Sequence, residues 1–180
     1  MKKLIIALAA LMVSISAYGQ GQFVFNNRVG STITARFILS TDPSNGSSSS
    51  IGSPDWTVQL FGGKVGDAVS ALVPLDPAGT TFRGAAGSTT AGYVTGVNPT
   101  IPGTTPGGSG LVLVKILGPN GFSQSFGPYT VDNLGGGTIT PPNLTALGTS
   151  PLVVTVVPEP ATLALGALGV GALLLIRRRK

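Results

Sequence analysis

The stretch from Leu111 to Val131 reads LVLVKILGPNGFSQSFGPYTV and carries the clearest structural signal in the chain. It begins with a nearly continuous apolar run at 111–117, typical of strands that lie inside a sheet. Pro119-Asn120-Gly121 follows, and Asn-Gly accepts the positive φ angles that a tight hairpin turn requires. A second β-rich run occupies 126–131. The stretch therefore predicts an antiparallel β-hairpin.

Similar short runs, rich in β-branched and aromatic residues, recur on both sides of this hairpin, and no window of useful length has a helical period. The other predicted strands are 22–29, 31–40, 56–61 and 152–157, with weaker candidates at 69–73, 80–83 and 92–97. The predicted turns are 42–46, 62–63, 76–79, 119–121 and 135–137. This pattern predicts an all-β body: a single antiparallel β-sandwich, immunoglobulin-like or jelly-roll-like, although a closed barrel fits nearly as well.

Alternation within the first two runs predicts which side chains are buried. Phe23, Phe25 and Asn27 share one side of the first run. Apolar and polar residues alternate through the second run in the same way. The aromatic side chains expected mainly in the core are Phe23, Phe25, Phe37, Trp56, Phe61 and Phe126.

The formal net charge of +5 over 180 residues comes from the two ends of the chain. Lys2 and Lys3 lie at the N-terminus, and a run of four basic residues occupies 177–180. Between residues 20 and 157, five basic side chains are balanced by five Asp. A neutral body with scattered charges lacks the electrostatic footprint of a nucleic-acid binder, so no nucleic-acid partner is expected.

The residue types that are missing narrow the chemistry further. The chain has no His and no Cys, which excludes the common zinc, copper and haem ligand sets and the Ser–His and Cys–His nucleophiles. It also has no disulfides to stabilise it. Five scattered Asp are a poor basis for glycoside hydrolysis, which needs two converging carboxylates; Asp42 and Asp55 are the pair that would have to meet. We expect no catalytic residue, no metal, no cofactor and no enzymatic activity.

The N-terminal segment has the features of a cleaved export signal. Met1-Lys2-Lys3 is followed by an apolar run at 4–13 and then by small residues. Ala17 and Gly19 suit the two positions that a signal peptidase inspects. The apolar run is too short to span a membrane comfortably. We therefore expect a signal peptide at 1–19, helical in its apolar part, removed after Gly19 by a signal peptidase.

The C-terminal segment combines three signals. Pro158-Glu159-Pro160 interrupts any strand or helix and favours an extended, solvated stretch that a protease can read. Residues 161–176 are uncharged, and as a helix they would extend about 24 Å, slightly less than the hydrocarbon core of a bilayer. The basic cluster Arg177, Arg178, Arg179 and Lys180 then acts as a stop-transfer signal. We predict one transmembrane helix at 161–176, in contact with membrane lipid.

This order of a Pro-Glu-Pro tripeptide, an apolar helix and a terminal Arg cluster resembles the PEP-CTERM sorting domain of Gram-negative bacteria that make exopolysaccharide. The resemblance covers 157–180 and implies processing by an exosortase, a membrane protease-transpeptidase, with Glu159 as a recognition element. Within the body, the stretch at 80–84 and the segment at 135–144 resemble small PEP-CTERM proteins of an uncharacterised Verrucomicrobia-like group. That second resemblance implies kinship and no activity.

These observations predict three parts: a signal peptide (1–19), a β-sandwich domain (20–156) and a sorting signal (157–180). The leading functional hypothesis is an exported cell-envelope or extracellular-matrix protein, anchored in the inner membrane, processed by an exosortase, and structural or interacting in its role. The alternative is a module that binds exopolysaccharide, with Trp56 and Tyr93 as its best aromatic candidates and Arg83 beside Phe82 and Tyr93 as a smaller patch. A glycoside hydrolase is the third hypothesis.

Overall fold

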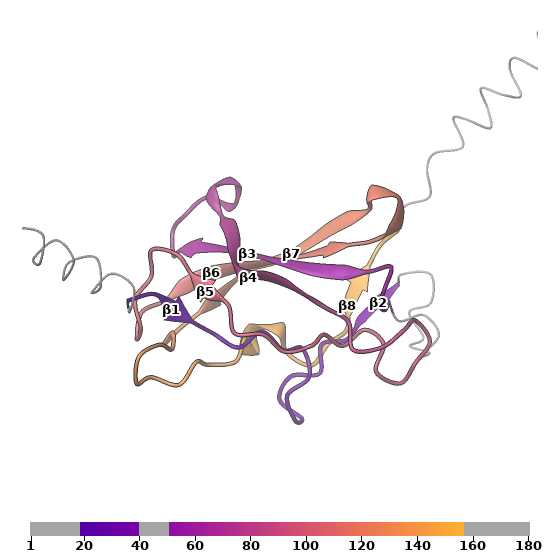
Figure 1. Cartoon of the computed structure of the whole chain (residues 1–180), viewed down its shortest axis with the longest axis horizontal. Helices are drawn as coiled ribbons and strands as arrows, with labels where there is room; N and C mark the ends of the chain where they lie inside the picture. Colours follow the sequence, from indigo (N-terminus) through magenta and orange to yellow (C-terminus); the bar gives the residue numbers. More distant parts are fainter. Residues whose placement is uncertain (1–18, 40–50, 157–180) are drawn as a thin grey trace, which may run out of the picture.

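The computed structural model describes residues 19–39 and 51–156, and within these ranges the chain is all-β (Figure 1). Six strands form one antiparallel sheet in the order β1-β5-β4-β3-β6-β7, and β2 and β8 form a separate parallel pair. The strands are β1 (Gly21–Gln22), β2 (Phe37–Leu39), β3 (Thr57–Lys64), β4 (Val73–Thr81), β5 (Thr100–Ile101), β6 (Gly110–Leu117), β7 (Ser123–Val131) and β8 (Leu152–Val154). The predicted all-β class is confirmed.

The β6–β7 hairpin is confirmed with its turn. Asn120 and Gly121 have φ angles of 56° and 74°, the positive values that an Asn-Gly turn accepts. The Gly118 N–H donates to the Phe122 carbonyl oxygen at 3.0 Å and closes the turn. Buried and half-buried residues alternate along β6, so only one face of this apolar strand lies in the core. Strand β6 does lie inside the sheet, between β3 and β7, as its apolar run predicted.

Two predicted turns are wrong, because the glycines that suggested them lie inside strands. Residues 62–63 belong to β3, and residues 76–79 belong to β4. A Cβ atom on Gly62 would lie 2.8 Å from the Leu111 carbonyl oxygen, and one on Gly79 would meet the Val58 carbonyl oxygen. Both glycines therefore serve the close approach of neighbouring strands and do not reverse the chain.

Strand β4 is shared between two partners. Gln59 pairs with Gly79, but Phe61 pairs with Pro74, so several β4 residues bulge out opposite a short step of β3. Within that bulge, Asp76 pairs with Thr100 of β5. The bulge thus joins β5, and β1 beyond it, to the regular part of the sheet.

The predicted strands at 22–29 and 31–40 form little regular sheet. Only β1 and β2 are paired, and between them a few residues make isolated bridges, such as Phe25 with Val97. The predicted alternation is nevertheless confirmed, since Phe23, Phe25 and Asn27 are completely buried. Of the weaker candidates, 69–73 contains the 3-10 turn Val69–Ala71, 80–83 holds the end of β4, and 92–97 contributes single bridges.

We call residues 22–36 and 82–99 the irregular layer. Its buried side chains share one hydrophobic core with those of β3 and β6, and Figure 1 shows these segments running along one side of the sheet. The Phe37 ring at the centre contacts Phe82 and Phe126 edge-on, at centroid distances of 5.9 and 5.6 Å. Trp56 and Phe126 lie partly buried against this core, whereas Phe61, which we expected inside, is half-buried outside it. The second layer of the predicted sandwich is therefore mostly irregular chain.

Asn27 holds the irregular layer together. Its amide nitrogen donates to the carbonyl oxygens of Ala35 and Gly92, at 2.9 and 2.8 Å. Its side-chain oxygen accepts from the Val94 N–H at 2.8 Å. The side chain is completely buried, so these bonds replace the water that its polar atoms lose on folding. One residue thus supplies the hydrogen bonds that a strand ladder supplies elsewhere.

Candidate functional site

The point where the chain leaves the β fold is fixed by one side chain. Gln124 of β7 donates through its amide nitrogen to the Val153 carbonyl oxygen at 3.0 Å, and its oxygen accepts from the Thr155 N–H at 2.8 Å. On its other side β8 pairs with β2. Val156, the last described residue, is 39 % exposed. We call this contact the Gln124 clamp; it fastens the body up to the residue where the predicted sorting signal begins.

Most residues of the two predicted signals lie outside the described residues. These are Ala17 of the signal peptide, the Pro158-Glu159-Pro160 tripeptide, the predicted transmembrane helix at 161–176 and the basic cluster 177–180. Gly19 is described and is half-buried, with open space around its Cα. Among the described residues, no helix is both long and apolar enough to cross a membrane.

The four Asp that the structure describes lie on separate segments. Asp67 caps the β3–β4 turn by accepting from the Lys64 N–H at 2.7 Å, and Asp132 accepts from the Ser109 hydroxyl at 2.6 Å. Asp55 is exposed on the turn before β3, and Asp76 is paired within the sheet. Asp42 lies outside the described residues. In the described ranges, no three acidic side chains come together in a way that would hold a metal ion.

Both aromatic candidates for sugar binding are half-buried and partly covered by neighbouring groups. Trp56 packs edge-on against Phe122 at 5.4 Å between ring centroids, and its ring also covers Gly118. Tyr93 is half-buried, with the guanidinium carbons of Arg28 and Arg36 at 4.8 and 5.3 Å from its ring centroid. These neighbours reduce the ring surface that either residue offers for stacking on a sugar.

The predicted patch of Arg83 beside Phe82 and Tyr93 is only partly assembled. Phe82 is buried, and its ring belongs to the core. Arg83 donates from Nε to the Val94 carbonyl oxygen at 2.7 Å and from a terminal nitrogen to the Asn26 side-chain oxygen at 3.1 Å. Tyr93 is adjacent through the backbone, since the Arg83 N–H donates to its carbonyl oxygen. Arg83 therefore fastens a hairpin edge, as a structural arginine does.

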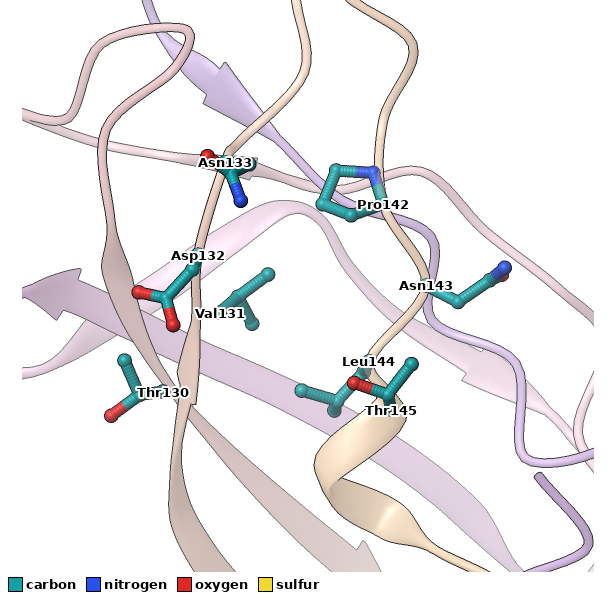
Figure 2. Close-up of a pocket in the computed structure, with 8 residues that line it drawn as sticks. All are labelled: Thr130, Val131, Asp132, Asn133, Pro142, Asn143, Leu144 and Thr145. Carbon is teal, nitrogen blue, oxygen red and sulfur yellow. The ribbon is translucent and has the colours of Figure 1, made fainter. Parts of the chain in front are cut away.

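A hollow of about 320 Å³ lies between the end of β7 and the segment 142–145 (Figure 2). Val131 and Leu144 lie between the two segments, and the Asn143 side chain points away from the hollow. Thr130, Asp132 and Thr145 supply polar groups at the rim, but the single carboxylate is already bonded to Ser109. The polar groups that line this hollow can donate and accept hydrogen bonds, but they include no paired acid and base.

Burial shifts the pKa of one tyrosine side chain on β7. Burial raises the pKa of the Tyr129 phenol, which lies on β7 against the core. Desolvation is the cause of this shift, which therefore reflects packing against the core.

Two structural residues were not identified from the sequence pattern. Asn27 was placed on the buried side, but its bonds to 35, 92 and 94 join segments far apart in the chain. The only available signal was a polar residue at an apolar position of an alternating run. Gln124 is half-buried on the same side of β7 as Phe126, and the sequence pattern did not single it out.

Residues 156–180 match the PEP-CTERM protein-sorting motif. The motif implies export, membrane anchoring and processing at the cell surface by an exosortase. None of the curated proteins and none of the solved structures compared with the chain matches it. The motif match covers the tail alone, so the resemblance of the body to a Verrucomicrobia-like group stays a prediction.

Proposed function

We propose that this chain is an exported cell-envelope or extracellular-matrix protein whose β domain is structural or interacting and has no catalytic role. The supporting observation is the sorting motif at 156–180, which begins at Val156, the last residue that the structure describes. The N-terminal segment fits the role of a Sec-type signal that a signal peptidase removes after Gly19.

The described polar groups agree with a non-enzymatic body. Asp67 and Asp132 each accept a local hydrogen bond, and the guanidiniums of Arg36 and Arg83 are fastened to backbone carbonyls. Charged side chains that hold turns and edges in this way stabilise a scaffold. We also propose that the body is a β-sandwich in the broad sense, with the irregular layer in place of a second sheet.

The test is co-expression of the full chain with an exosortase, in wild-type form and as Glu159→Ala. We expect the wild type to lose its C-terminal segment and leave the inner membrane, while Glu159→Ala stays full-length and membrane-bound. Intact mass and fractionation measure both results, and the same mass shows whether the mature chain starts at Gln20.

Asp132→Ala is the matched control, because it removes a carboxylate from the body and leaves the tripeptide intact. It should be processed like the wild type. If wild type and Glu159→Ala both remain full-length in the inner membrane, the tail is an ordinary anchor and the proposal is wrong.

A further inference from the structure

Three arginines from different parts of the irregular layer converge on one turn. Arg28 and Arg36 approach the ring of Tyr93, and the Arg83 N–H bonds to the Tyr93 carbonyl oxygen. We call these three side chains the arginine cluster. The body as a whole is neutral, so the cluster concentrates most of its positive charge in one place.

Hydrogen bonds fasten Arg36 and Arg83, and among the described residues these bonds do not use all of their donors. Arg36 donates from Nε to the Ala91 carbonyl oxygen at 2.7 Å and from one terminal nitrogen to Ser88 and Thr89 at 3.3 Å. Because a guanidinium has five N–H donors, the other terminal nitrogen of Arg36 still carries donors for a ligand. Arg83 bonds to Val94 and Asn26 and likewise keeps donors.

No carboxylate occurs in the segments that build the cluster. All the hydrogen bonds described for Arg36 and Arg83 go to uncharged oxygens. The sequence from 19 to 41 and from 77 to 131 contains neither Asp nor Glu. Among the described carboxylates, Asp55 is on a turn that reaches this region through the Ser53 N–H and the Gly84 carbonyl oxygen, and it sets one negative charge against three positive ones.

We propose that the arginine cluster binds an acidic polysaccharide through the carboxylates of its uronic acid units. The planar fork of a guanidinium matches a carboxylate with two parallel hydrogen bonds, and pre-fastened side chains lose little entropy on binding. Asn26, Ser88 and Thr90 lie beside the cluster and offer hydrogen bonds to sugar hydroxyls. Tyr93 acts here by positioning the arginines, and not as a stacking platform.

The size of the cluster favours this polymer over other polyanions. DNA-binding proteins typically neutralise about 6–10 phosphates, and lipid-binding basic segments carry about 4–8 cations. Three arginines fall short of both. A polymer that repeats a carboxylate on every unit can gain avidity from many copies of a weakly binding domain. The proposal rests on the proposed function to the extent that export brings the body into contact with such a polymer.

The test measures binding of the full chain in non-ionic detergent to polygalacturonate, with fully methyl-esterified polygalacturonate as the uncharged control. We expect binding to the acidic polymer only, weakening as salt rises. Arg28→Gln should weaken it about five-fold and Arg28→Gln with Arg83→Gln about ten-fold or more, in line with modest exposed ion pairs. Arg28→Lys keeps the charge without the fork and should lie between wild type and Arg28→Gln.

Lys115→Gln is the matched control, since it removes a body cation on β6 outside the cluster. The terminal basic residues are the same in every variant, so any binding they contribute stays constant. Arg28 has the Tyr93 ring as its side-chain contact, and unfolding midpoints followed by Trp56 fluorescence show whether each variant is folded.

Three results would overturn the proposal. One is equal binding to the esterified polymer, and another is equal loss in Lys115→Gln and Arg28→Gln. The third is tighter, Arg28-dependent binding to duplex DNA or to phosphatidylglycerol vesicles, which would assign the cluster to another polyanion. The assay involves no exosortase, so its failure is distinct from a failure of Glu159-dependent processing.

Discussion

The regular sheet and the irregular layer bury their backbones in different ways. Strands β3, β6 and β7 exchange hydrogen bonds along ladders of neighbouring residues. The irregular layer makes isolated bridges, and side chains such as Asn27 and Arg36 supply many of the missing partners. A ladder divides its stability over many equivalent bonds, whereas the irregular layer depends on a few residues. A single substitution at one of these residues should therefore lower the free energy of unfolding more than a substitution in the regular sheet.

The largest expected effect is that of Asn27→Leu. It removes three hydrogen bonds and leaves the Ala35 carbonyl and the Val94 N–H buried without a described partner, while the Gly92 carbonyl keeps its bond from the Phe37 N–H. We expect a loss of about 3–5 kcal/mol in the free energy of unfolding, since each orphaned buried group costs about 1–3 kcal/mol. Urea unfolding of the full chain, followed by the fluorescence of Trp56, measures it. Asn26→Ala at the neighbouring position is the control; a comparable loss there would contradict the role given to Asn27.

The next prediction compares two glycines of the irregular layer. Gly92 and Gly87 both have positive φ, at 77° and 82°. A Cβ on Gly92 would meet the Phe37 carbonyl oxygen and lie 2.7 Å from Arg36 Cγ, whereas one on Gly87 meets nothing within 4 Å. We expect Gly92→Ala to cost about 3 kcal/mol and Gly87→Ala about 1 kcal/mol, because only the first adds overpacking to backbone strain. Equal unfolding midpoints for the two variants would show that the irregular layer can rearrange to accept a Cβ atom at Gly92.

A third prediction applies one chemical change to both regions. Ile33 of the irregular layer and Ile116 of β6 are both completely buried. Changing either to Val removes one methyl group and should cost about 1 kcal/mol. Similar losses in urea unfolding would show that packing is equally tight and that hydrogen bonding alone separates the regions. A much smaller loss at Ile33 would mean that the irregular layer is also loosely packed.

Removal of the Gln124 clamp should have a mainly local effect on stability. Gln124→Ala removes two exposed hydrogen bonds and should change the global free energy of unfolding by less than about 1 kcal/mol. Amide exchange at Thr155 should nevertheless become about ten-fold faster, because its N–H loses its partner. Gln59→Ala, at an exposed position on β3, should leave that exchange rate unchanged. Unchanged exchange at Thr155 in Gln124→Ala would contradict the clamp.

The smallest effect concerns alkaline pH. Burial raises the pKa of Tyr129 in the folded state, so the unfolded chain releases this proton first as pH rises. The contribution of Tyr129 to the free energy of unfolding should therefore be constant below about pH 10 and should decline above it. Tyr129→Phe should reduce the decline, measured as the difference in urea midpoint between neutral and alkaline pH. An identical decline in both chains would exclude Tyr129 as its source.

The sequence predicted what depends on neighbours in the chain. The β6–β7 hairpin follows from residues 111–131, because the turn at Asn120-Gly121 brings adjacent runs together. Strand β4 was missed because Asp76-Pro77 and Gly79 are typical of a turn, and only the contact of Gly79 with Val58 explains a glycine inside a strand. The arginine cluster could not be predicted either, since Arg28, Arg36 and Arg83 are far apart in the sequence and meet through contacts with Tyr93 and Asn26.

The two described ends of the chain also decide how the body would carry a mechanical load. Figure 1 places β1 and β8 near opposite ends of the long axis. A pull between these ends acts first on the two residues of β1, the three residues of β8 and the Gln124 clamp. The long strands between them would be loaded only after these short links give way. The terminal strands would thus detach first and let the chain lengthen, and the release of β8 would also withdraw Val154 from the core.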